Sequence, residues 1–382
     1  MTNEKKEVSS GLQVNRRDFL KSIGIIGGTL AISPAILAAC SSGSSSKAKS
    51  VTISNWTSYI SDQLKKDFEK DTGIKLTYIE DINDNSEYFA KIQPVLNRNE
   101  SINRDGFMLT DWMANRIINQ VKWAQPLDDS KFPNKKNLTS NLASPSFDKT
   151  RKYSAPWASV PAGIAYNIAQ TGKELKTFDD FLAVSGTKTV LSEMRDTIGI
   201  IGLAKGIDIE NSGMKEFGPV FDDLKNYIDS GKISGINGNE YVTDLSGGNL
   251  AACFAWAGDV AQITIDNPDV RFYVPESGGT NASDNFMIPI SSDKPGLATE
   301  FINYFYDPVV SAKWVQEVQF ISPVKGVGEE LRKLGGEAAK LADNPLVNPS
   351  DEFLESLNIF ASLSEKDEEE FDARSSEITG AG

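Results

Sequence analysis

The stretch VTISNWTSYI, residues 51–60, alternates apolar and polar residues as a β-strand does, and then enters a polar turn. Asp62–Lys70 follows with the spacing of an amphipathic helix, which a glycine ends at Thr72-Gly73. The next apolar run, Ile74–Ile79, predicts a second strand. Strand, helix and strand in this order predict an α/β fold with a mostly parallel sheet and helices on its faces.

Similar strand and helix patterns continue along the chain. Its length is sufficient for two α/β lobes, each with its own core. The acidic segment 364–374, SEKDEEEFDAR, is expected to be a solvated helix face rather than a binding element. The further strands are expected at Asp105–Thr110, Gly163–Tyr166, Lys188–Leu191, Leu250–Trp256, Arg271–Val274 and Asn285–Ile290, and the helices at Ser86–Asn97, Phe178–Val184, Asp196–Lys205, Phe221–Ser230, Gly296–Tyr306 and Ser311–Val318.

The first forty residues have the features of an export signal. Asn15–Lys21 holds paired arginines, an uncharged apolar run follows, and Leu-Ala-Ala-Cys ends at Cys40. This pattern is typical of a twin-arginine signal with a lipid attachment site. The alternative, a membrane-spanning helix, needs about 20 continuously apolar residues, whereas two glycines and a proline interrupt this run. We therefore expect a signal peptide at 1–39, lipid on Cys40, a flexible tether at 40–50, and a folded body that is extracytoplasmic and anchored to the cell membrane.

Composition excludes several classes of function. The chain has no histidine, which removes Ser-His-Asp catalysis and His-ligated metals. The leader carries five basic and three acidic residues, so its removal changes the net charge from −14 to −16. Such a charge disfavours nucleic acid and suits a small cationic partner. Cys253 lies in an apolar run and is expected in the core, so no disulfide forms. We expect a monomer without cofactor or metal.

Carboxylates and aromatic rings recur in the loops next to predicted strands, where ligands bind in α/β proteins. Each has an ordinary alternative, since tryptophan often covers a core and Asp196 could cap a helix. Together they suit a buried organic cation, because carboxylates neutralise ammonium groups and rings line the alkyl chain between them. The acids are Glu193, Asp196, Asp259 and Asp284, and the rings are Trp56, Tyr59, Trp112, Trp256 and Phe320.

At these residues the chain resembles the polyamine-binding proteins of ABC transporters, the spermidine/putrescine receptors. The resemblance extends over nearly all of the chain after the leader. It implies a periplasmic-binding-protein-like fold, with two α/β lobes, a hinge and a ligand cleft between them. We expect lobe I from 51–158 and 285–315, and lobe II from 159–284 and 316–382. The segments that carry the resemblance are Asn55–Ile60, Asp71–Lys75, Gln125–Asp128 with Asn137-Leu138, Tyr153–Trp157, Trp256–Val260 and the strand at Asp284.

The resemblance also implies a role for each residue of the site. Two positions depart from the family pattern: Ser58 stands where an acid is usual, and Ala282 where an aromatic is usual. Phe320 replaces a common tyrosine. These departures leave the preferred polyamine open. The implied ring walls are Trp56, Trp112 and Trp256, the polar supports are Thr57 and Thr110, the amine partners are Glu193, Asp196, Asp259 and Asp284, and Tyr59 and Phe320 complete the ligand-binding set.

The function expected from these observations is capture of putrescine or spermidine outside the cell and delivery to an ABC permease, without any chemistry. Three alternatives stay open. A surface-tethered hydrolase would use Glu193, Asp196 and Asp259 as acid and base. The receptor would otherwise bind a different small cationic or neutral solute, or feed a sensor protein instead of a permease.

Overall fold

The structure is a computed structural model that describes residues 49–380, which fall within one compact unit. The expected signal peptide, the lipid site at Cys40 and nearly all of the tether lie outside the described residues. Among residues 49–380, no helix is long and apolar enough to cross a membrane.

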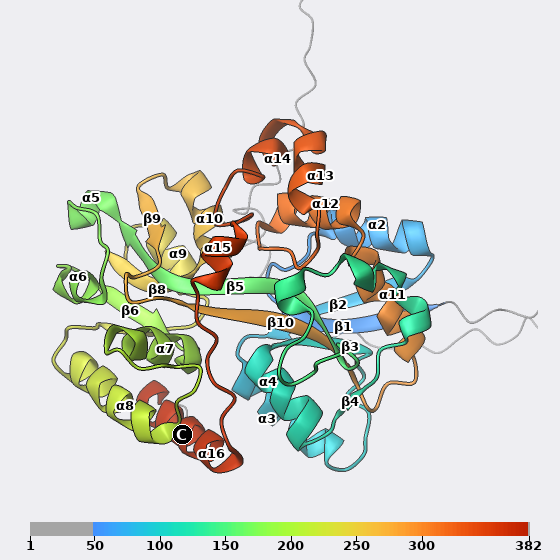
Figure 1. The fold of residues 1–382 in the computed structure, drawn as a ribbon, viewed down its shortest axis with the longest axis horizontal. Coiled ribbons are helices and arrows are strands. Elements are labelled where there is room, and N and C mark those ends of the chain that lie inside the picture. Colours follow the sequence, from blue (N-terminus) through green and yellow to red (C-terminus); the bar gives the residue numbers. More distant parts are fainter. Residues whose placement is uncertain (1–48, 381–382) are drawn as a thin grey trace, which may run out of the picture. The chain divides into compact units, whose positions relative to one another are not determined.

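The described part is built around one mixed sheet in the order β2-β1-β3-β10-β5-β8-β6-β7. Figure 1 shows the long strands β5 and β10 at its centre. The predicted βαβ unit is confirmed, since β1 (Ser50–Trp56) pairs in parallel with β2 (Lys75–Ile82) across α2 (Asp62–Thr72). The expectation of a mostly parallel sheet is wrong at the centre, where β10 (Thr280–Pro289) runs antiparallel to β3, β4 and β5. The remaining strands are β3 (Gly106–Thr110), β4 (Ala124–Gln125), β5 (Ser154–Asn167), β6 (Lys188–Leu191), β7 (Gly235–Asn237), β8 (Ala252–Trp256) and β9 (Val270–Tyr273).

Helices cover both ends of this sheet and agree with most of the sequence-based ranges. Helix α8 starts seven residues before the predicted Phe221, with Pro219 inside it. The α-helices are α3 (Asn85–Leu96), α4 (Asp111–Asn115), α5 (Ile168–Thr171), α6 (Phe178–Ala183), α7 (Met194–Ala204), α8 (Met214–Asp229), α9 (Tyr241–Ser246), α10 (Ala257–Asp266), α11 (Pro295–Phe305), α12 (Pro308–Val318), α13 (Val327–Leu334), α14 (Gly336–Leu341), α15 (Asp351–Glu355) and α16 (Glu365–Thr379). The short 3-10 and π turns are η2 (Arg116–Gln120), η3 (Asp129–Lys131), η4 (Pro133–Asn137) and η5 (Ser140–Leu142).

Strand β5 is much longer than the four residues that the sequence predicted, and every one of its 14 residues is buried. Pro156 and Pro161 lie inside it, and proline argues against a strand interior because it cannot donate a ladder hydrogen bond. The strand tolerates Pro156 where its pairing with β10 shifts register between Asp284 and Asn285. Such a shift is a β-bulge, which relieves the ladder locally.

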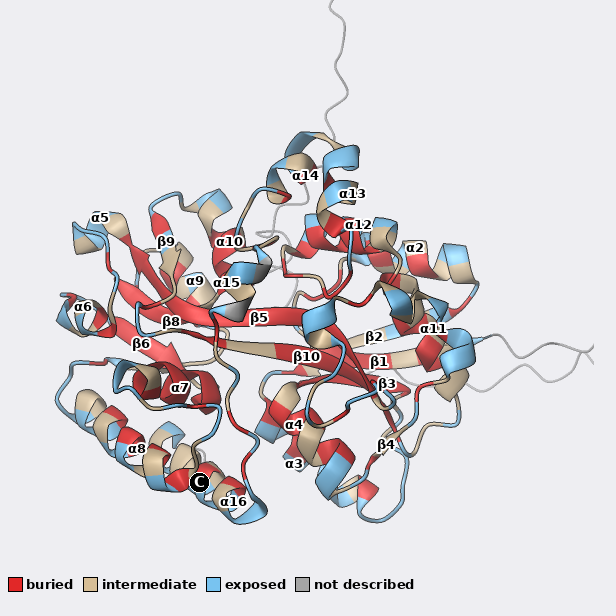
Figure 2. Ribbon diagram, viewed as in Figure 1, coloured by how far each residue is buried: buried red, intermediate tan, exposed pale blue. Residues whose placement is uncertain are grey.

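Buried side chains form separate hydrophobic clusters at the two ends of the sheet. Figure 2 colours the buried residues red, and they include most of the central strands β5 and β10. We call the part packed around β1–β3 the first half and the part packed around β6–β8 the second half. Strand β5 contributes to both, through Trp157 to the first and Ile164 to the second. Side chains of residues 318–347 pack in the first half, and those of 361–371 in the second. Cys253 is fully buried in the second half, which confirms the prediction of a core residue.

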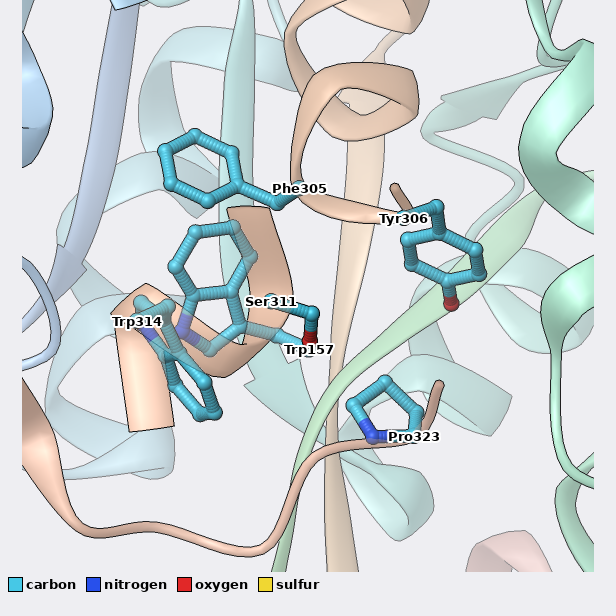
Figure 3. A pocket seen from close by; sticks show the side chains of 6 residues that line it. All are labelled: Trp157, Phe305, Tyr306, Ser311, Trp314 and Pro323. Atoms are coloured by element: carbon cyan, nitrogen blue, oxygen red, sulfur yellow. The ribbon is translucent and has the colours of Figure 1, made fainter. Parts of the chain in front are cut away.

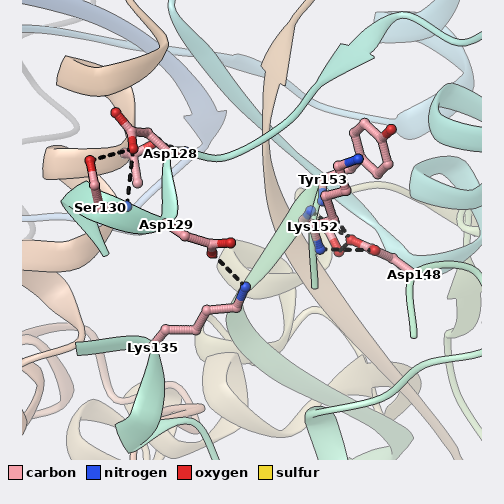
Figure 4. Close-up of polar contacts among 9 residues, drawn as sticks. Asp128, Asp129, Ser130, Lys135, Asp148, Lys152 and Tyr153 are labelled. Atoms are coloured by element: carbon pink, nitrogen blue, oxygen red, sulfur yellow. Dashed lines mark hydrogen bonds and ion pairs between the residues drawn. The ribbon is translucent and has the colours of Figure 1, made fainter. Parts of the chain in front are cut away.

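Polar loops join these elements, and several segments that carried the family resemblance have structural roles there. Asp148 organises the entry to β5, because its Oδ2 accepts hydrogen bonds from the backbone nitrogens of Tyr153 and Ser154 at 2.8 and 2.9 Å (Figure 4). Asp128 caps its turn in the same way, accepting from the Ser130 nitrogen at 3.0 Å. These carboxylates satisfy backbone donors that would otherwise be unpaired.

Candidate ligand-binding site

Strand ends from both halves meet at a cavity that contains about 520 Å³ of space, including the solvent at its mouth. Ten of the eleven predicted site residues line it, all but Trp112. The lining contains four carboxylates and neither lysine nor arginine. The lining residues are Trp56, Thr57, Tyr59, Asn85, Thr110, Val160, Glu193, Asp196, Asn239, Trp256, Asp259, Ala282, Asp284 and Phe320.

Asp284 is the acid that lies on the central strand β10. The Tyr59 hydroxyl donates to its Oδ2 at 2.6 Å, whereas its buried Oδ1 has no hydrogen-bond partner in the described structure. The pKa of Asp284 is raised to about 7, chiefly by burial; the Tyr59 hydrogen bond lowers it, and the charges of Asp111 and Asp196 contribute to the rise. One carboxylate oxygen of this cavity-lining residue therefore lacks a hydrogen-bond partner in the described structure, and a cationic donor would satisfy it.

A hydrogen-bond network holds the segment of β10 that carries Asp284, opposite the bulge in β5. Asp111 accepts from the Asn285 side-chain nitrogen at 2.7 Å and from the Ser283 backbone nitrogen at 2.8 Å. Arg151 donates to the Asn285 oxygen at 2.7 Å, which places its positive charge behind the network. Fully bonded buried networks are rigid, so this arrangement fixes the direction of the Asp284 side chain.

Glu193 and Asp196 lie at the start of α7 in the second half. Glu193 accepts from the Asn85 side-chain nitrogen at 3.0 Å, and Asp196 accepts from Trp256 Nε1 at 2.9 Å and from the Thr280 hydroxyl at 2.6 Å. The side chain of Asp196 is thus committed to two partners from other elements. Burial raises the pKa of Glu193 to about 8, with contributions from Asp84 and Asp196.

Asp259 occupies the first turn of α10, directly after β8. The hydroxyl of Tyr241 donates to its Oδ2 at 2.6 Å and in turn accepts from the Trp256 backbone nitrogen at 3.1 Å. Burial raises the pKa of Tyr241 well above its usual value, and the Asp259 charge adds to this, so the hydroxyl keeps its proton and remains a donor. The pair thereby links the β8 strand end to the carboxylate beside the cavity.

Aromatic side chains form the apolar part of the cavity lining. Tyr59 and Phe320 lie with ring centroids 4.6 Å apart, and Trp56 and Trp256 come from the ends of β1 and β8. The buried Trp56 Nε1 and Thr110 Oγ1 have no hydrogen-bond partner in the described structure. Flat apolar surface beside unpaired polar atoms suits a guest that is partly apolar and partly polar.

Trp112, which the sequence predicted as a third wall, is not among the lining residues. It is buried in the first half, and the guanidinium carbon of Arg195 lies 3.3 Å from its ring centroid. Helix α4 begins at Asp111, so Trp112 belongs to this helix and does not line the cavity. Thr110, the last residue of β3, does line it. The Trp112 ring therefore faces a cation of the chain itself.

Three lining residues escaped the sequence analysis: Asn85, Val160 and Asn239. Asn85 is the first residue of α3, Val160 lies inside β5 and Asn239 follows β7. Only Asn85 had a local signal, since it follows Asp84, the N-cap of a predicted helix. Ala282 also lines the cavity, so the position where the family pattern has an aromatic ring borders the space directly.

A second, smaller hollow lies in the first half between α11, α12 and β5, and Figure 3 shows its aromatic lining. Its lining contains no charged residue: Trp157, Phe305, Tyr306, Ser311, Trp314 and Pro323. Trp314 Nε1 donates to the Tyr59 backbone oxygen at 2.7 Å, and the Tyr306 hydroxyl donates to the Pro156 oxygen at 2.6 Å. Through the Trp314 bond, the residues that line this hollow support the backbone at Tyr59.

The close approach of Gly258 to Phe320 gives a first testable prediction. A Cβ at Gly258 would lie 2.6 Å from the Phe320 ring, so Gly258→Ala must displace this ring. We expect a loss of about 1–3 kcal/mol in the free energy of unfolding, as for other overpacked sites, measured by urea denaturation. Gly218→Ala in α8 is the matched control, because its Cβ meets nothing within 4 Å. Equal stability of the Gly258→Ala variant and the parent would contradict the prediction.

Comparison with known proteins places this cavity in a family context. Residues 63–348, more than half of the chain, match the family described as bacterial extracellular solute-binding protein. The chain belongs to this family. As a solute-binding protein it is not an enzyme, which removes the hydrolase alternative.

Two curated relatives of this solute-binding protein bind a diamine. The putrescine-binding periplasmic protein PotF of Escherichia coli is 26% identical over 359 residues, covering 85% of this chain and 88% of PotF. The putrescine-binding periplasmic protein SpuD of Pseudomonas aeruginosa is 24% identical over 342 residues, covering 83% and 88%. A solved structure assigned to a spermidine/putrescine ABC transporter of Listeria monocytogenes has a TM-score of 0.77 at 22% identity, covering 87% and 100%. The predicted periplasmic-binding-protein fold is confirmed.

Proposed function

We propose that this solute-binding protein captures a polyamine, putrescine or spermidine, outside the cell and delivers it to an ABC permease. The observation that carries the proposal is a cavity with four carboxylates, aromatic rings and no basic residue. Burying a carboxylate without a counter-charge is costly, so the cavity favours a guest that brings positive charge. Two relatives described as putrescine-binding support the same class of guest.

A linear amine with a positive charge at each end matches the distribution of the cavity carboxylates between the two halves. Glu193 lies in the second half, and Asp284 lies on the strand shared with the first half, so a guest that contacts both connects the two halves. Methylene groups between the amines would gain from contact with Trp56 and Trp256, and ring faces attract nearby ammonium groups by about 0.5–2 kcal/mol each. Closure around the guest would select the form that a permease recognises, as in other hinged binding proteins.

Isothermal titration calorimetry on the chain that begins at Ser41 tests the substrate class. Putrescine, cadaverine, spermidine and spermine are titrated separately, with a neutral sugar as control. We expect saturable binding of at least one amine, with a negative heat-capacity change from the buried methylenes and rings. An absence of heat with all four amines up to millimolar concentration would refute polyamine capture.

The proposed location depends on residues outside the described structure. We propose twin-arginine export and lipidation of Cys40, which would tether the folded body to the cell membrane. Radiolabelled palmitate supplied to cells expressing the full chain should label the protein, and Cys40→Ser should abolish the label. Equal labelling of both proteins would refute the anchor.

A further inference from the structure

The C-terminal helix α16 contacts both halves of the molecule. On one side it packs against α8, where Phe371 meets Phe221 with ring centroids 5.0 Å apart, and Figure 1 shows the two helices side by side. On its other side Asp372 forms an ion pair with Arg116 at 3.0 Å. Arg116 begins η2, whose Ile117 and Ile118 pack in the first half. The acidic tail is thus more than a solvated face.

Arg195 makes a second connection at the same place. Its guanidinium donates to Glu368 of α16, and both side chains are only 5% exposed. One aromatic neighbour of the guanidinium is Trp112 of the first half, with 3.3 Å to the ring centroid, and another is Phe371 of α16, with 4.7 Å. Cation–π contacts are strongest when water is excluded, as it is here. The Arg195 guanidinium of the second half therefore makes a cation–π contact with the Trp112 ring of the first half.

These contacts lie beside the ligand cavity. Arg195 stands between Glu193 and Asp196 in the sequence, and both of these acids line the cavity. The side chain of Arg195 points instead to Trp112 and Glu368, so it contacts no cavity space itself. A change in the angle between the halves would separate Arg195 from Trp112 and Asp372 from Arg116.

We propose that α16 is a latch, made of the Arg195–Glu368 pair on Trp112 and the Arg116–Asp372 pair, that stabilises the closed arrangement of the two halves. The inference rests on the proposed capture of a ligand by closure. Its physical basis is population shift: when only a fraction of the protein is in the binding-competent form, the apparent Kd is the intrinsic Kd divided by that fraction. The latch raises this fraction without touching the ligand.

The test uses Asp372→Asn in the full chain, with putrescine as the probe. Asp222→Asn is the matched control, because it breaks the Arg374–Asp222 ion pair, which joins α16 only to α8 in the second half. We expect Asp372→Asn to weaken putrescine binding about two- to five-fold, mainly through faster dissociation, as for a partly exposed ion pair. The charge exchange Arg116→Asp with Asp372→Arg should restore binding. Unchanged affinity, or equal losses in the variant and its control, would overturn the latch.

A readout without ligand separates this inference from the proposed function. Small-angle X-ray scattering of the ligand-free full chain should give a larger radius of gyration for Asp372→Asn than for the parent or for Asp222→Asn. If putrescine fails to bind the parent protein, the scattering still decides the latch. Identical radii for all three proteins would refute it, whatever the ligand is.

Discussion

Replacing Asp284 by asparagine is expected to weaken putrescine binding by about 2–5 kcal/mol, because the substitution leaves one ammonium group of a buried cation unpaired. The substitution keeps the shape of the side chain, and the Tyr59 hydroxyl can still donate to the amide oxygen at the position of Oδ2. The lost affinity would therefore report charge rather than packing. Calorimetry at pH 8 measures it, where the carboxylate of the parent is largely ionised.

Glu193→Gln removes a carboxylate that the second half contributes to the cavity and should cause a loss of similar size, about 2–5 kcal/mol. Glu337→Gln is the control for net charge, because Glu337 is exposed on α14, pairs with Lys340 three residues along and does not line the cavity. It should bind like the parent. If both cavity variants also bind like the parent, the ligand does not lie among these acids and the site is misplaced.

The second large effect is a dependence of affinity on pH. Burial raises the pKa of Asp284 to about 7 and that of Glu193 to about 8 in the empty protein. A cation requires both groups ionised, so affinity should rise with pH by on the order of a thousandfold between pH 6 and pH 8.5. Amine ligands keep their charge over this range, since alkyl ammonium groups lose their proton only near pH 10.

The free energy of unfolding of the ligand-free protein should fall as the pH rises, opposite to the change in affinity. A carboxyl group whose pKa is higher in the folded than in the unfolded chain binds its proton more tightly when folded. The contribution of such a group to the free energy of unfolding is complete below about pH 4. It is lost as the pH rises through the pKa values of the folded protein, near 7 for Asp284 and near 8 for Glu193. Thermal shifts on ligand addition should thus grow from pH 6 to pH 8.5. Affinity that is constant over this range would contradict ionisation on binding.

Sequence patterns predicted much of this arrangement because local rules and tertiary structure agree there. The βαβ unit at residues 50–82 follows from its periodicity, and strand-end acids such as Asp259 converge because parallel strands end at one edge. The length of β5 was not predictable, since Pro156 and Pro161 contradict the strand rule and only the bulge opposite Asp284 accommodates the first. The antiparallel centre also requires pairing between residues far apart in sequence.

The position of Trp112 outside the cavity lining has a similar origin. Its position after a strand predicts a cavity wall equally for Trp56 and Trp112, and nothing local distinguishes them. The difference arises from Arg195, 83 residues further along, which offers Trp112 a cation within the protein. Asn85 and Asn239 were missed because asparagine at a helix start or after a strand is ordinary turn chemistry. Long-range contacts decide both cases.

Asp284 lies on β10 opposite the bulge in β5, where the two strands that join the halves pair with each other. Asp284 pairs with Thr110 of β3 on one side and Ala158 of β5 on the other, and β5 has side chains in both cores. Any rotation of one half against the other must flex these two shared strands. We therefore expect a ligand bound at Asp284 to act directly on the strands that bend. No chain of intermediate contacts is then needed to couple ligand binding to the conformational change.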